Sequence, residues 1–187
     1  DVMVALDAKS KGELLIERSG RLELGRRELI LGYNPGGQAR MTLEGSFSSG
    51  GFVFIGRNND SSKLVIDGGS LVTSERVQLA QYDSAQDTQS EVIIRNGGRL
   101  KAGSLRLIHD DARLLLEDGI VEVDLLELGS GESGSEVEIV QTGGVVRAER
   151  VRVDGGKYDL RGGNLILKGE WDAGRWREEF QAETDGL

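Results

Sequence analysis

Apolar residues recur in short runs along nearly the whole chain, and within each run they occupy every second position. The segment "SEVIIRNGGRLKAGSLRLIHD", residues 90–110, contains a first run, a glycine pair, a second run, a polar break, a third run and a loop. Period-2 spacing over four to six residues is typical of β-strands with one buried face. The pattern predicts three short strands in this segment.

The same unit can be laid over residues 12–170 in seven rows. Each row carries a glycine between its first and second runs, and these glycines are 25, 24, 29, 21, 25 and 19 residues apart. Strand-like units that recur with a period of about 24 residues indicate a solenoid. We expect the glycines to form tight corners in which a positive φ excludes other residues. They are Gly20, Gly45, Gly69, Gly98, Gly119, Gly144 and Gly163.

One row cannot bury its apolar side chains alone, whereas rows stacked at ~4.8 Å close a continuous core. The sequence therefore predicts an all-β parallel β-helix, or β-solenoid, of about seven three-strand turns in a single domain, residues 1–187. An antiparallel sandwich or barrel also has short strands between turns and is the alternative. It does not explain why a three-run unit recurs seven times.

Both ends of a solenoid expose strand edges that must be covered or used. Residues 1–11 alternate Val2, Val4 and Leu6 and predict an N-terminal cap strand. Residues 171–187 predict a C-terminal cap, with Trp176 and Phe180 on one face of a short helix and Trp171 beneath it, or else an eighth degenerate turn. These six side chains are also candidates for end-to-end contacts between copies, which makes a homo-oligomer or head-to-tail assembly the expected state.

Composition narrows the function classes. The net charge is −9, with 32 acidic and 23 basic residues, which disfavours nucleic acid as a partner. No apolar run approaches the roughly 18 residues of a membrane span. The sequence has no cysteine, so disulfides and thiolate chemistry are excluded. It starts at Asp1 without a signal peptide, which is expected of a processed or trimmed product and is compatible with export.

Candidate chemistry is sparse. The only histidine, His109, is followed by Asp110 and Asp111, a set that can bind a metal but that also suits a plain turn. No calcium nonapeptide, phosphate loop or dinucleotide motif is present. We expect no catalytic, cofactor or metal residues, and so no enzyme. The long loops after the third runs, with Tyr33 and Tyr82, are the first choice if any surface binds a partner, although plain solvated turns are the simpler explanation of their composition.

The rows "VEIVQTGGVVRAERVRVDGGKYDLRGGNLIL" and "SSKLVIDGGSLVTSERVQLA" resemble the Gly-Gly β-strand repeats of bacterial secreted and surface proteins, of the autotransporter-passenger type. The likeness covers residues 12 to about 170. It implies a right-handed parallel β-helix outside the cell or at the cell surface, used as an adhesin, stalk, surface-layer or matrix component.

Two functions are consistent with this pattern. The first is a non-enzymatic extracellular structural or adhesive β-solenoid that assembles end to end into a filament or surface layer. The alternative is a β-helix that binds or degrades an extracellular polysaccharide, as a lyase does. Such a protein needs a groove with a general base and basic side chains, and its candidates here, Lys101 and Arg106 among them, are spread singly over outward strand positions.

Overall fold

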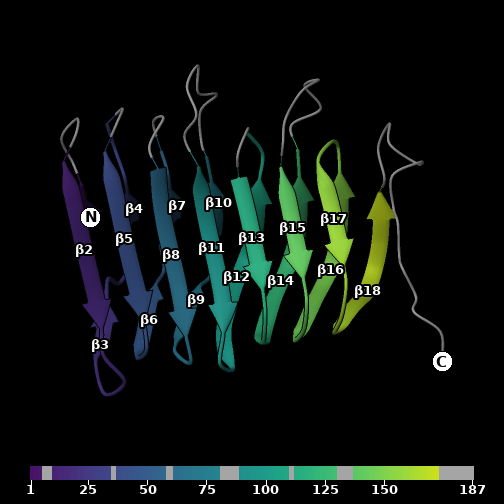
Figure 1. The fold of residues 1–187 in the computed structure, drawn as a ribbon, viewed down its shortest axis with the longest axis horizontal. Coiled ribbons are helices and arrows are strands. Elements are labelled where there is room, and N and C mark those ends of the chain that lie inside the picture. Colours follow the sequence, from purple (N-terminus) through teal and green to yellow (C-terminus); the bar gives the residue numbers. More distant parts are fainter. Residues whose placement is uncertain are drawn as a thin grey trace.

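The structure is a computed structural model that describes residues 1–5, 10–34, 37–57, 61–80, 89–109, 112–129 and 137–172. Within these ranges the chain is all-β, without a helix. Successive rows lie side by side along the long axis (Figure 1), and every strand pair is parallel. The predicted β-solenoid is therefore confirmed, and the antiparallel alternative is wrong. The right-handed winding and the single-domain boundaries stay predictions.

The first runs of the seven rows form one seven-stranded sheet. Its register aligns the inward residues of neighbouring rows, so that Met41 lies opposite Leu64 and Leu64 opposite Val92. The strands are β2 (Lys11–Ile16), β5 (Gln38–Leu43), β8 (Ser61–Asp67), β11 (Ser90–Arg95), β13 (Ala112–Leu116), β15 (Glu138–Gln141) and β17 (Lys157–Leu160).

The second and third runs together form an eleven-stranded sheet. In the first three rows they are separate strands: β3 (Arg21–Glu23) and β4 (Leu29–Leu31), β6 (Ser46–Ser49) and β7 (Val53–Ile55), β9 (Ser70–Thr73) and β10 (Arg76–Leu79). In the last four rows they merge into one long strand each: β12 (Gly98–Leu107), β14 (Gly119–Leu128), β16 (Val145–Val153) and β18 (Asn164–Asp172). Turns with three strands thus occur only in the first part of the chain.

Inward hydroxyl groups of one row bond to carbonyls at the break between the second and third runs of the row before it. Thr73 Oγ1 donates to the Gly51 carbonyl at 2.7 Å, and Ser49 Oγ donates to the Arg27 carbonyl at 2.6 Å. These bonds satisfy carbonyls that the interrupted strand leaves without a partner. In the following rows the corresponding inward residues are Ala102 and Val123, which offer no such bond, and the strand continues unbroken.

The core fills the space between the two sheets. Most of its apolar side chains are completely buried, including Met41, Leu43, Phe47, Ile66 and Leu100. One polar pair is enclosed near β17, where Tyr158 Oη donates to Gln141 Oε1 at 2.7 Å. Burial raises the pKa of the Tyr158 phenol, so this group stays neutral and keeps its hydrogen bond.

The corner glycines form a column in which each row touches the next. A Cβ on Gly119 would lie 2.2 Å from the Gly98 carbonyl oxygen, and one on Gly69 would lie 2.4 Å from that of Gly45. Gly119 also has a φ of 141°, whereas Gly69 has no positive φ. The expected positive φ is therefore wrong for part of the set, and the close approach of neighbouring backbones is the more general requirement.

At the N-terminus β1 (Val2–Val4) joins the eleven-stranded sheet as its edge strand, parallel to β4, with Val2 opposite Leu29. It occupies the place of a third run because its alternating side chains pack Val2 and Val4 against the core. At the other end Trp171 belongs to β18, opposite Val151, and Leu6, Trp176 and Phe180 lie outside the described residues.

Candidate functional site

The outer face of the eleven-stranded sheet carries two rows of side chains that the parallel register sets side by side. One row runs through Phe54, Gln78, Arg106, Glu127 and Arg152. The second, two residues earlier in each strand, runs through Arg76, Ser104, Leu125 and Arg150. Because adjacent strands are ~4.8 Å apart, neighbours within a row are close enough for their side chains to interact.

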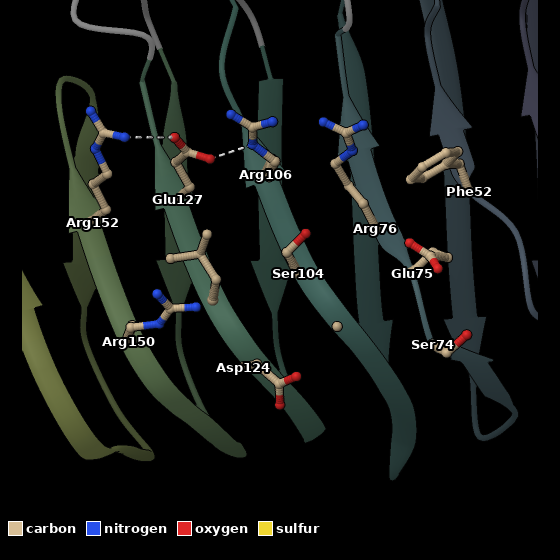
Figure 2. Close-up of a pocket in the computed structure, with 12 residues that line it drawn as sticks. Phe52, Ser74, Glu75, Arg76, Ser104, Arg106, Asp124, Glu127, Arg150 and Arg152 are labelled. Carbon is tan, nitrogen blue, oxygen red and sulfur yellow. Dashed lines mark hydrogen bonds and ion pairs between the residues drawn. The ribbon is translucent and has the colours of Figure 1, made fainter.

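These rows line a shallow, open groove with a volume of about 500 Å³. It extends across β10, β12, β14 and β16, with Phe52 at one end (Figure 2). Its charged lining comprises four arginines and three acids: Arg76, Arg106, Arg150, Arg152, Glu75, Asp124 and Glu127. The lining therefore has one positive charge in excess, on a chain whose net charge is −9.

Glu127 is held between two arginines. Its carboxylate pairs with Arg106 Nε and lies 3.6 Å from Arg152 Nη1, and only 7% of its side chain is exposed. Arg152 Nε also lies 2.5 Å from the Asp154 carboxylate. Figure 2 shows the two arginines on either side of Glu127. A buried carboxylate needs such partners, so this part of the groove is internally compensated.

No acidic side chain among the described residues forms an ion pair with Arg76. Its guanidinium carbon lies 4.9 Å from the centre of the Phe52 ring, a cation–π contact, and its Nε is buried without a hydrogen bond. Burial and then the positive charge of Arg106 lower the pKa of Arg76. The residue opposite Arg106 on β10 is the neutral Gln78, which is 4% exposed. The alternation of charge therefore stops at Gln78, and Arg76 lies two residues before it on the same strand.

A smaller hollow lies beside the groove, over the second-run part of the same sheet, with a volume of about 240 Å³. Here Glu122 pairs with Arg99 and lies 3.6 Å from Arg147 Nη1. The hydrogen bond from Arg99 holds the pKa of Glu122 below its usual value. Lys101 also lines this hollow. Arg99 and Arg147 therefore each have an acidic partner in Glu122, unlike Arg76.

The structure separates the two basic residues that the sequence analysis named together. Arg106 lies in the large groove and Lys101 in the smaller hollow. His109 is described, but Asp110 and Asp111 are not. In the described parts of the chain no three His, Cys, Asp or Glu side chains gather to hold a metal ion.

The loops proposed as a binding edge fall mostly outside the described residues, Tyr82 included. Tyr33 is described: its ring centre lies 5.7 Å from the guanidinium carbon of Arg57. The same guanidinium lies 4.7 Å from the ring centre of Phe54. This cluster stabilises the start of the loops and lies on the outer face next to the groove.

Sequence reasoning missed Arg76, Arg150, Arg152 and Phe52 as site residues. A signal for them exists: Arg76 and Arg150 each precede a third run, while Arg106 and Arg152 occupy its outward position in their rows. Aligning the rows by their third runs instead of their glycines brings these residues together.

Comparison with protein-family models, with curated proteins and with solved structures finds no match for this chain. Across the described ranges, no helix has the length and apolarity that a membrane crossing requires. The class that the fold defines is the parallel β-solenoid repeat protein, here with an arginine-rich groove on the outer face of its larger sheet.

Proposed function

We propose that this chain is a non-enzymatic structural and adhesive β-solenoid module that acts outside the cell or at the bacterial cell surface. The observation that carries the proposal is the groove: a cationic surface on the rigid outer face of a sheet in a chain that is otherwise acidic. A solenoid keeps such a surface in fixed geometry because every strand is held by the rows on both sides.

Ion pairs between successive rows support the rigidity of the module. On the outer face of the seven-stranded sheet, Lys63 Nζ lies 2.6 Å from Glu91, and Arg113 Nε lies 3.2 Å from Glu138. Each pair joins residues more than 20 positions apart in the sequence. A surface held in this way loses little conformational entropy when it binds a partner, which favours adhesion.

End-to-end assembly is the second part of the proposal. Among the described strands, β1 pairs only with β4 and β2 only with β5. Met3 on β1 and Leu15 on β2 are 43% and 54% exposed. An unpaired strand edge with exposed apolar side chains is suited to addition of another strand, so a second copy can continue both sheets.

Sedimentation velocity at rising protein concentration tests the assembly. We expect species larger than the monomer, and Leu15→Lys should shift them toward monomer because it places a charge at the edge. Monomers at every concentration overturn the assembly part. Protease treatment of intact producing cells tests the location, since a surface protein is cleaved without lysis.

A polysaccharide-binding or polysaccharide-degrading β-helix is the second candidate, favoured by the same groove. Arginine donors next to carboxylate acceptors suit a ligand that has both acidic and hydroxyl groups. Incubation with uronic acid polymers separates binding from degradation: chains that shorten with time support an enzyme, and chains that bind to the protein and keep their full length support a binding module.

A further inference from the structure

We propose that the groove is a binding site for an extended acidic polysaccharide, with a sugar carboxylate held between Arg76 and Arg106. The inference rests on the proposed function, in which the module acts by binding. Its central observation is the interruption of charge alternation on adjacent strands: Arg152, Glu127 and Arg106 alternate, and Gln78 follows where an acid would continue the series.

The guanidinium of Arg76 is oriented so that it can bind an anionic group of a ligand. Its guanidinium is stacked on Phe52 at 4.9 Å, a contact that fixes the plane of the group and leaves its N–H edge available. Its Nε is buried without a hydrogen-bond acceptor, so no acceptor inside the protein holds this group, and the terminal NH2 groups of the guanidinium are the donors offered to a ligand. Figure 2 shows Arg76 and Arg106 side by side with no carboxylate between them.

The other groups in the groove favour a sugar acid over a more highly charged ligand. Asp124 and Glu75 add carboxylates to the lining of the groove, and Ser104 adds a hydroxyl. Sugar hydroxyls can donate to such acceptors and so offset the repulsion between these acids and an anionic ligand, whereas phosphate groups have no donors to offer. Four arginines against three acids cannot neutralise the closely spaced phosphates of a nucleic acid.

The spacing of the arginines points to a polymer instead of a single sugar. Arg76 and Arg150 lie in the same outward row, three strands apart, which corresponds to ~14 Å along the solenoid. One strand spacing is similar to the length of one sugar unit in an extended chain. A bound oligomer can therefore place one carboxylate between Arg76 and Arg106 and another at Arg150.

Isothermal titration with a purified galacturonic acid hexamer tests the site. Arg76→Gln should weaken binding about tenfold, because it removes charge-assisted hydrogen bonds. The matched control is Arg40→Gln, which makes the same substitution at an exposed residue of β5 on the opposite face and should change affinity less than twofold. Arg76 forms no ion pair with the described residues, so its replacement removes no salt bridge and the folded state should persist in both variants.

A second variant supplies the missing anion from within the chain. Gln78→Glu places a carboxylate opposite Arg106 and two residues from Arg76, where it competes with the ligand. We expect hexamer binding to fall at least tenfold while the melting temperature does not fall. Wild-type affinity in this variant overturns the inference.

Three further ligands test the proposed ligand class. If monomeric galacturonate binds as tightly as the hexamer, the ligand is not a polymer, and if polyglutamate binds as tightly, the ligand is not a glycan. If a neutral sugar hexamer binds as tightly, the arginines do not determine binding. Absence of binding to every acidic glycan overturns the proposed site. The end-to-end assembly is unaffected by that result, because sedimentation velocity tests it separately. Shortening of the hexamer contradicts the non-enzymatic function but not the position of the site.

Discussion

The outer faces of the two sheets are built on the same parallel register, yet they use their charged residues differently. On the seven-stranded sheet, Glu91 lies between Lys63 and Arg113, and Glu138 lies between Arg113 and Lys157. On the eleven-stranded sheet, Glu127 lies between two arginines in the same manner, but the series then reaches the neutral Gln78 and the unpaired Arg76.

The difference teaches what distinguishes a structural charge ladder from a binding surface. A base that has an acid on the next strand is compensated within the protein and offers little to a ligand. A base that the ladder leaves without an acid keeps its hydrogen-bonding capacity for a partner. On the seven-stranded sheet the long charged side chains also shield the outward Val65, which is 2% exposed.

The largest expected effect on stability comes from a substitution at Gly119, in the corner that connects the two sheets. Gly119→Ala forces a Cβ against the Gly98 carbonyl at 2.2 Å and strains a φ of 141°. We expect a loss of about 3 kcal/mol in the free energy of unfolding, measured by urea denaturation, with both faces disrupted. Gly25→Ala is the control: its φ is 60° but nothing lies within 4 Å of the new Cβ, so its cost should be about 1 kcal/mol. Equal costs would contradict the close-contact explanation.

The next effect separates the two faces. Glu91→Lys places three positive side chains on adjacent strands of the seven-stranded sheet and should lower the free energy of unfolding by about 1 kcal/mol at low salt. Added salt should reduce this loss because it screens the repulsion. Glu17→Lys makes the same charge change at an exposed residue and should cost less. Hexamer binding should survive both substitutions; its loss would show that the two faces are coupled.

The smallest effect is a shared dependence on pH. Hydrogen bonds from Asn96 and Arg95 lower the pKa of Asp67 on one face, and that from Arg99 lowers the pKa of Glu122 on the other. A carboxyl group whose pKa is lower in the folded state stabilises above its unfolded pKa, and the contribution is lost as the pH falls through the folded pKa. Asp67→Asn and Glu122→Gln should each reduce the free energy of unfolding that is lost on acidification by a few tenths of a kcal/mol. The effect is small because solvent screens both pairs. Urea denaturation at several values between neutral and acidic pH measures this loss. A variant that loses as much stability at acidic pH as the wild type contradicts the prediction.

The rows, the corner glycines and the parallel stacking could be predicted because each depends on a local pattern. The division of the larger sheet could not be read so directly. Ser49 and Thr73 lie opposite each other at the ends of β6 and β9, but the partner of the Thr73 hydroxyl is the Gly51 carbonyl, which belongs to the preceding row. The bond exists only once the rows are stacked.

The sequence by itself determined that this chain winds into stacked rows around an apolar core, because alternating side chains and a recurrent unit leave no other way to bury the apolar faces. Only the tertiary structure decided which outward residues meet. Arg106 lies opposite Glu127, 21 positions ahead, and opposite Gln78, 28 positions behind. Loops of unequal length account for the difference between 21 and 28 positions. The lateral register of the strands, and not the distance along the chain, therefore creates the groove.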